Sequence, residues 1–200
     1  PRIGVVMNID NCFKNVKWLG LGPHESYIDS CSSVKFDLWE RKIEDMHTPY
    51  IFPQENGNRH NVKSFSLEDE RNIRMYFETL DEKFDFSISE YTIENIENAG
   101  HTYDLKKSDF LQLKIDMEQY GLGSASCGEE VLEKYRLHCK NFEFSFKVVE
   151  INLYPSFCNS FIFSISGCKS LIFFIDFSCF NVNGNITILI KIVTIIIAIP

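Results

Sequence analysis

Residues 110–119 read FLQLKIDMEQ, and their pattern is informative about the fold class. Apolar residues at every second position alternate with polar ones: Leu111, Leu113, Ile115 and Met117 against Gln112, Lys114, Asp116 and Glu118. Successive side chains of a β-strand point to opposite faces of the sheet, so the alternation predicts a half-buried strand. We therefore expect strands of this kind to be the main elements of the chain.

Similar patterns recur along the chain. Alternation with period two occupies residues 61–67, 83–91 and 141–149, and short apolar runs bounded by turn residues occupy residues 2–9 and 15–22. Short strands separated by turn-rich loops are typical of antiparallel sheets that pack face to face. We therefore predict a mainly β fold, an antiparallel β-sandwich.

One stretch looks helical. Residues 91–101 read YTIENIENAGH, with Ile93 and Ile96 at helical spacing. Thr92 can accept a hydrogen bond from the first turn as an N-cap, and Gly100 suits the end of a helix. We expect a short helix between these two residues.

The composition changes near Lys147. Charged residues are frequent before it, whereas Ile and Phe dominate after it. We therefore divide the chain into residues 1–147, which form the sandwich part, and residues 148–200, an unusual apolar tail.

Three interpretations of the tail compete. A membrane-spanning helix needs about 20 consecutive apolar residues, and Asp176 and Lys191 interrupt the two candidates. Strands of a folded core fit the β-branched and aromatic residues. Ile, Phe, Asn and Lys are also the residues that A/T-only codons encode, so we favour read-through of non-coding sequence, or disorder, over a native segment. A membrane partner is not expected.

Charge and cysteine content exclude several classes. The net charge of -8 argues against a nucleic-acid partner held by a basic surface. The seven cysteines are scattered without a C-x-x-C motif, which suits reduced thiols better than disulfides. The chain starts PRIGVV, without a signal peptide or an initiator Met. We expect a cytoplasmic protein and a fragment of something longer.

Two carboxylates lie in loops rich in turn residues. Glu25 is part of GPHESY and Glu55 is part of PQENGNR. A retaining glycosidase needs two carboxyl groups about 5 Å apart. A Glu in a turn more often accepts hydrogen bonds that fix the loop, and Arg59 could form a bidentate pair with Glu55. We therefore predict structural loop roles for Glu25, Glu55 and Arg59.

The stretch 120–131, YGLGSASCGEEV, places Cys127 in a glycine-rich loop. Neither this stretch nor GLGPHE completes G-x-G-x-x-G, and no P-loop lysine follows, so nucleotide binding is not expected. A catalytic pair of Cys127 with His101 rests on residue type alone. No histidine lies at a zinc-ligand spacing from a cysteine, so no metal site is predicted.

Four motifs in order carry a resemblance to a known family. They read VKWLGLGPHESYIDS, MHTPYIFPQENGNRHNVK, FDFSISEYTIENIENAGHTYDL and YGLGSASCGEEVLEKYRL. Residues 1–147 resemble the C-terminal domain of the large β-galactosidases of glycoside hydrolase family 2. In that family the region is the C-terminal part of a large β-sandwich.

The resemblance implies a function for the whole enzyme rather than for this chain alone. The family hydrolyses terminal non-reducing β-D-galactosides with retention, through two glutamates of a central barrel that precedes this domain. The Mg²⁺ and Na⁺ sites of the family are also upstream. We therefore expect no catalytic residue, no bound cofactor and no activity in this fragment. The implied partners are the upstream domains, the β-galactoside substrate of the full enzyme, and further copies in a homo-oligomer.

The resemblance also assigns a role to the glycine-rich loop. In many members a loop of this domain reaches over the barrel mouth and contacts the sugar through a tryptophan in GGDDSW. Cys127 stands at the tryptophan position in GLGSASCG, between Ser126 and Gly128. We therefore expect Cys127 to bind substrate at the active-site rim, with Ser126 and Gly128 as neighbouring contacts. A thiol offers less area to a sugar than an indole does.

A non-catalytic carbohydrate-binding module is the alternative. Such a module displays exposed aromatic side chains, and four candidates are available: Trp18, Tyr27, Trp39 and Tyr50. Trp18 and Tyr50 lie within apolar strand patterns, so we expect core packing to be their use.

Overall fold

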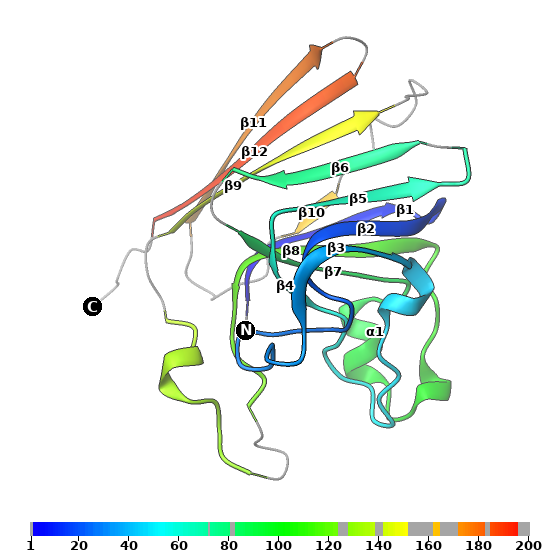
Figure 1. Cartoon of the computed structure of the whole chain (residues 1–200), viewed down its shortest axis with the longest axis vertical. Helices are drawn as coiled ribbons and strands as arrows, with labels where there is room; N and C mark the ends of the chain where they lie inside the picture. Colours follow the sequence, from blue (N-terminus) through cyan, green and yellow to red (C-terminus); the bar gives the residue numbers. More distant parts are fainter. Residues whose placement is uncertain are drawn as a thin grey trace.

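The structure is a computed structural model that describes residues 2–71, 73–80, 83–123, 128–138, 142–151, 162–164, 172–182 and 185–195. Strands form two antiparallel sheets, which lie one over the other in Figure 1. The prediction of a mainly β, antiparallel sandwich is confirmed.

The first sheet has five strands in the order β10-β1-β8-β7-β4. Its members are β1 (Arg2–Asp10), β4 (Arg59–Val62), β7 (Phe84–Ser89), β8 (Phe110–Gln119) and β10 (Ile162–Ser164). The alternating stretch 110–119 is β8, which lies at the centre of the sheet between β1 and β7. This position gives β8 a hydrogen-bonded neighbour along each edge.

The second sheet has seven strands in the order β11-β12-β9-β6-β5-β2-β3. Its members are β2 (Phe13–Gly22), β3 (Lys35–Lys42), β5 (Ser64–Asp69), β6 (Arg74–Thr79), β9 (Phe142–Ile151), β11 (Ile172–Val182) and β12 (Asn185–Ile195). The sequence patterns did not predict β3, which is an edge strand with a mostly exposed surface, or β6. An edge strand with little burial carries little hydrophobic alternation, so the pattern is weak there.

Aromatic rings fill the space between the sheets. Phe65 on β5 stacks on Phe77 of the neighbouring strand, with ring centroids 4.4 Å apart. Its other face stacks on Phe86 of β7 in the opposite sheet at 4.2 Å. Burying each such side chain stabilises the fold by about 1.5–3 kcal/mol. Leu111, Leu113 and Ile115 of β8 join this core, as expected.

On the opposite face of β8, two of the polar side chains do not meet water. Lys114 and Asp116 are buried, although the alternation predicts a solvent-exposed polar face. The prediction of a half-buried strand is therefore wrong for these two positions. Glu55, from the segment between η1 (Ile43–Met46) and β4, reaches Lys114 with a nitrogen–oxygen distance of 3.2 Å. A sequence period cannot reveal that a distant loop covers a polar face.

The stretch 61–67, expected to be one strand, is divided between the two sheets. β4 ends at Val62 and pairs with β7, whereas β5 starts at Ser64 and pairs with β2. Asn61 adopts a φ of 56°, a left-handed conformation that Asn tolerates better than most residues do. The chain therefore crosses from one sheet to the other at Lys63.

The expected helix is present as α1 (Ile93–Asn98). Thr92 is its N-cap, and its side-chain oxygen accepts a hydrogen bond from the backbone nitrogen of Asn95 at 3.1 Å. The helix ends before Gly100, as predicted. Two single turns, η2 (Thr102–Asp104) and η3 (Glu133–Tyr135), complete the helical elements among the described residues.

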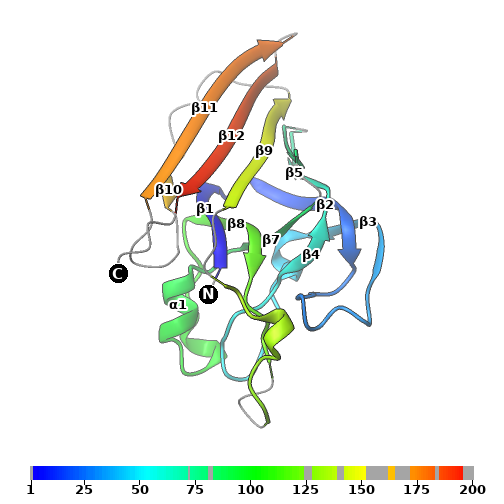
Figure 2. The same ribbon diagram turned by 90° about the vertical axis from the view of Figure 1, so that its left-hand side faces the viewer.

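The described parts of the tail are β10, β11 and β12. β12 pairs with β9 from Ile186 opposite Glu150 to Thr194 opposite Phe142, and β11 pairs with β12. Figure 2 shows β9, β12 and β11 as a ribbon that extends beyond the first sheet. Within the described residues, no helix has the length and apolarity that crossing a membrane requires. The interpretation of residues 148–200 as read-through, and the division after residue 147, stay predictions.

Candidate functional site

The start of the glycine-rich loop is held by one carboxylate. Asp29 accepts hydrogen bonds from the backbone nitrogen of Leu122 at 3.1 Å and from that of Gly123 at 2.7 Å. These donors are 93 and 94 residues away along the chain. The backbone nitrogen of Gly121 donates to the carbonyl of Tyr135 at 3.0 Å. The loop therefore leaves β8 from a fixed position.

Two glycines make this close approach feasible. A Cβ at Gly121 would lie 2.6 Å from a carboxylate oxygen of Asp29, which is closer than any real contact. Gly123 has a φ of +65°, and a Cβ there would lie 2.8 Å from a side-chain carbon of Val131. Such backbone conformations and contacts favour glycine. The glycines of GLG thus serve the packing of the loop base.

The predicted sugar contacts follow these glycines in the sequence. Ser126 and Cys127 are outside the described residues, as is any pairing of Cys127 with His101. Gly128 is described and exposed. The substrate-binding roles of these three residues stay predictions.

Asp29 itself lies on a short, hydrogen-bonded turn. Tyr27 and Ser30 exchange two backbone hydrogen bonds, at 3.1 and 2.9 Å, and the Tyr27 side chain is buried. Next to it, the backbone nitrogen of Ser26 donates to the carbonyl of Asn58 at 2.8 Å. The turn is thus tied to the segment that leads into β4.

Glu25 fixes a second loop, residues 48–57. It accepts hydrogen bonds from the side-chain hydroxyl of Thr48 at 2.9 Å, from the backbone nitrogen of Gly57 at 2.7 Å, and from the hydroxyl of Tyr50. Burial and the bond to Glu25 raise the pKa of Tyr50 to about 12, so this hydroxyl stays a donor at neutral pH. Both ends of the loop are therefore tied to one carboxylate.

Glu55, on the same loop, enters a buried charge network. It lies 2.6 Å from a guanidinium nitrogen of Arg2 and 3.2 Å from the ammonium of Lys114. Arg2 also donates to Asp116 at 2.9 Å. Burial favours the protonated form of Glu55, but Lys114 and Arg2 outweigh it and hold its pKa below the usual value. For Asp116, burial prevails and raises the pKa to about 7.

The expected pairing of Glu55 with Arg59 is wrong. Arg59 is buried and donates to the carbonyl oxygens of Gly57 at 2.9 Å and Asn58 at 3.3 Å, and its guanidinium lies 5.2 Å from the Trp18 ring centre. Sequence proximity suggested the pair, but both residues lie near a turn that sends their side chains to different groups. Arg59 holds the turn through main-chain carbonyls.

Two of the histidines have structural contacts. His60 lies 2.9 Å from Asp85, and His47 contacts the ring of Tyr91. Within the described residues, no group of three or more His, Cys, Asp or Glu is arranged to hold a metal ion. Trp18 and Tyr27 are buried, and Trp39 and Tyr50 are half-buried. The expectation of core packing is confirmed for Trp18, whereas Tyr50 lies in a loop outside any strand.

Asp29 is the residue that sequence reasoning missed. It lies within SYIDS, part of a quoted motif, but no local pattern connects a half-buried turn carboxylate with glycines more than 90 residues later. The GLG sequence indicates that the backbone approaches another group closely, but it does not identify Asp29 as that group.

Comparison with known proteins connects these features to a family. The sequence model of the family described as "Beta galactosidase small chain" matches residues 1–148. A β-galactosidase of Kluyveromyces lactis is 34% identical over 148 residues, which cover 73% of this chain and 14% of that protein. A β-galactosidase of Staphylococcus xylosus is 34% identical over 148 residues, or 74% of this chain and 15% of that protein.

A third relative, a β-galactosidase of Streptococcus thermophilus, is 30% identical over 154 residues, 76% of this chain and 15% of that protein. The chain therefore spans about 15% of the length of the curated relatives that it matches. The matched region contains both carboxylates that hold loops and the glycines of the loop base. The resemblance stated from the motifs is confirmed: this chain belongs to the β-galactosidase small chain family.

Proposed function

We propose that this chain is the terminal β-sandwich part of a β-galactosidase that hydrolyses terminal non-reducing β-D-galactosides with retention. Upstream domains supply the catalytic barrel, its two glutamates and the Mg²⁺ and Na⁺ sites. Residues 1–147 complete the rim of the active site and contribute no catalytic residue. The fragment is inactive alone, and the full enzyme acts in the cytoplasm, where homo-oligomers are its natural assembly.

The observation that carries this proposal is the Asp29 anchor. A loop that contacts substrate from a neighbouring domain has to start from a fixed position, because an error of about 1 Å can cost 100-fold in rate. Asp29 holds two consecutive backbone nitrogens of the loop at 3.1 and 2.7 Å, and Gly121 packs against the same carboxylate. A side chain at Gly121 or Gly123 would clash with Asp29 or Val131. The requirement for glycine at both positions supports a loop base with one defined conformation.

Cys127 is the proposed contact of this loop with the sugar, and Ser126 and Gly128 flank it. A thiol offers a small apolar surface and a weak donor, so it binds an aglycone less strongly than a stacked indole does. We therefore expect the chain to confer a higher KM than tryptophan-bearing relatives have, without an effect on the chemical step.

The test is reconstruction of a complete enzyme. Residues 1–148 replace the matching segment in the Staphylococcus xylosus β-galactosidase, and hydrolysis of an aryl β-galactoside and of lactose is measured. Activity of the chimera supports the proposal, and an intact but inactive chimera argues against it. Cys127→Trp in the chimera should lower KM by more than about threefold with kcat nearly unchanged.

The carbohydrate-binding alternative makes a different prediction. Of its four candidate platforms, two are buried and two are half-buried, which disfavours sugar stacking. Lactose binding by the isolated 200-residue chain, measured by calorimetry, would favour the alternative. Binding only after assembly into the chimera supports the proposed rim.

A further inference from the structure

The loop of residues 48–57 presents two large apolar side chains to solvent. Ile51 is 89% exposed and Phe52 is 65% exposed. Scattered single apolar residues are normal on a protein surface, but adjacent ones at the tip of a loop are unusual when nothing covers them. An exposed apolar tip of this kind is typical of a surface that a partner covers.

The loop that carries this tip is held rigidly. Glu25 binds Thr48, Tyr50 and the backbone of Gly57, and the backbone nitrogen of Thr48 donates to the Asn56 side chain at 3.1 Å. Glu55 adds a third attachment through Arg2 and Lys114. A loop that is ordered before binding loses little conformational entropy on binding. Fixing two exposed apolar side chains in this way is the arrangement of a preformed contact site.

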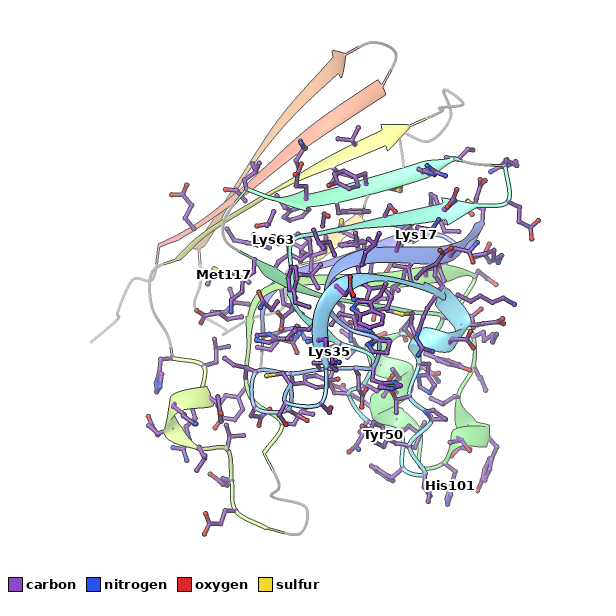
Figure 3. All side chains as sticks on the ribbon, viewed as in Figure 1. Lys17, Lys35, Tyr50, Lys63, His101 and Met117 are labelled. Carbon is purple, nitrogen blue, oxygen red and sulfur yellow. The ribbon has the colours of Figure 1, made fainter. Side chains whose placement is uncertain are left out.

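A third large apolar side chain is exposed on a neighbouring segment at the same end of the molecule. Tyr103, on η2, is 78% exposed, and its ring stacks on His101 with centroids 4.8 Å apart. The loop of residues 48–57 lies beside α1 and η2 in both Figures 1 and 2, and Figure 3 places Tyr50 and His101 at the same end of the molecule. The ring contact between His47 and Tyr91, at 5.0 Å, joins the two segments. We call Ile51, Phe52 and Tyr103 together the apolar end surface.

We propose that the apolar end surface docks onto the remainder of the longer β-galactosidase polypeptide, in an apolar pocket of that remainder. This inference rests on the proposed function. The chain spans about 15% of its relatives' length, so most of such an enzyme lies outside it and has to contact it somewhere. A second copy of the chain is the weaker occupant, because each copy carries a net charge of -8 and like charges repel.

The geometry also connects the apolar end surface to the proposed rim. Glu25, which holds the loop of Ile51 and Phe52, is four residues before Asp29, which holds the glycine-rich loop. Docking at the first loop therefore fixes the segment from which the second is positioned. The docked surface orients the rim without touching the sugar.

The experiment measures association of two separate polypeptides. One is the 200-residue chain, and the other is the Kluyveromyces lactis β-galactosidase without the segment that matches this chain. Calorimetry measures the Kd for the unchanged chain and for the double variant Ile51→Ser/Phe52→Ser. The matched control is Phe36→Ser/Leu38→Ser on edge strand β3, where the two side chains are 45% and 69% exposed.

The expected result is a Kd raised about tenfold or more by the double variant and by less than about twofold by the control. Circular dichroism should show the same fold for all three proteins, because the altered side chains are exposed. Association that the double variant leaves unchanged would overturn this inference alone. No association of the unchanged chain would overturn the proposed function as well. Loss of self-association in the double variant would instead make a second copy the occupant and overturn the inference.

Discussion

Two carboxylates four residues apart hold two loops in different ways. Glu25 accepts three hydrogen bonds, two of them from side chains, and its loop adds a second attachment through Glu55. Asp29 accepts two hydrogen bonds, both from backbone nitrogens at the start of a loop. Among the described residues, the first loop is thus held at both ends and through Glu55, and the second is held at Leu122 and Gly123.

The difference shows how one short segment can build two kinds of surface. A loop fixed at several points presents preformed contacts, as residues 48–57 present Ile51 and Phe52. Backbone contacts hold residues 121–123 at the base of the glycine-rich loop, and they set the position from which the chain leaves β8. The variants below remove Glu25 or Asp29, or change residues in the contacts that hold the two loops.

The largest expected effect is that of Glu25→Ala. It removes an acceptor of three hydrogen bonds and leaves the Thr48 and Tyr50 hydroxyls without this partner. Because hydrogen bonds to charged groups contribute more than neutral ones, we expect a loss of about 3 kcal/mol in the free energy of unfolding. Urea denaturation of the 200-residue chain measures it. Glu97→Ala, an exposed position on α1, is the comparison variant and should change stability by less than about 0.5 kcal/mol.

The network under the loop of Glu55 predicts a pH effect. The pKa of Asp116 is raised from 3.8 to about 7 by burial, so between these values the folded state keeps a proton that the unfolded state has released. The contribution of Asp116 is therefore fully present below about pH 4 and is lost as pH rises to about 7. Glu55 acts in the opposite sense, because its pKa is lowered and its contribution is lost only at acidic pH.

Asp116→Asn isolates this contribution. The variant should lose the decline in stability between about pH 4 and about pH 7 that Asp116 adds to the unchanged chain. Thermal unfolding of both proteins at intervals across this range measures the difference. If the two profiles run parallel, Asp116 does not titrate in this window, and the account of the network is wrong.

The strands of the core could be predicted because their pattern is local. Leu111, Leu113 and Ile115 alternate with polar residues whatever else the chain does, and Thr92 caps its own helix within three residues. The quoted motifs indicated the family for a similar reason, since each is a short continuous stretch of sequence. Features that depend only on residues nearby in the sequence could therefore be predicted.

Contacts between distant segments could not be predicted in this way. The burial of Lys114 and Asp116 depends on Glu55, which comes from a loop 59 residues earlier than Lys114. The pairing of Glu55 with Arg59 was expected because the two are close in sequence, but three-dimensional packing gives each a different partner. The Asp29 anchor has the same origin, and only a tertiary structure reveals it.

A smaller effect is expected from Gly123→Ala at the base of the second loop. The φ of +65° disfavours any residue with a Cβ, and the added atom would lie 2.8 Å from Val131. We expect a loss of about 2 kcal/mol, from the left-handed conformation together with the contact. Gly100→Ala is a matched control, because a Cβ there meets only a flexible carboxylate oxygen at 3.7 Å. Equal melting temperatures for the two variants would argue against strain at Gly123.

The smallest expected effect on global stability is that of Asp29→Ala, although it decides whether the comparison is right. The hydrogen bonds of Asp29 lie in an exposed region, so their loss should lower the free energy of unfolding by only about 1 kcal/mol. Hydrogen exchange at the amides of Leu122 and Gly123 should nevertheless accelerate by about tenfold or more, because these amides lose their acceptor. The amide of Gly57, which Glu25 holds, should exchange at an unchanged rate. Faster exchange at Gly57 as well would mean that the two loops are one cooperative unit, and that the two carboxylates do not act separately.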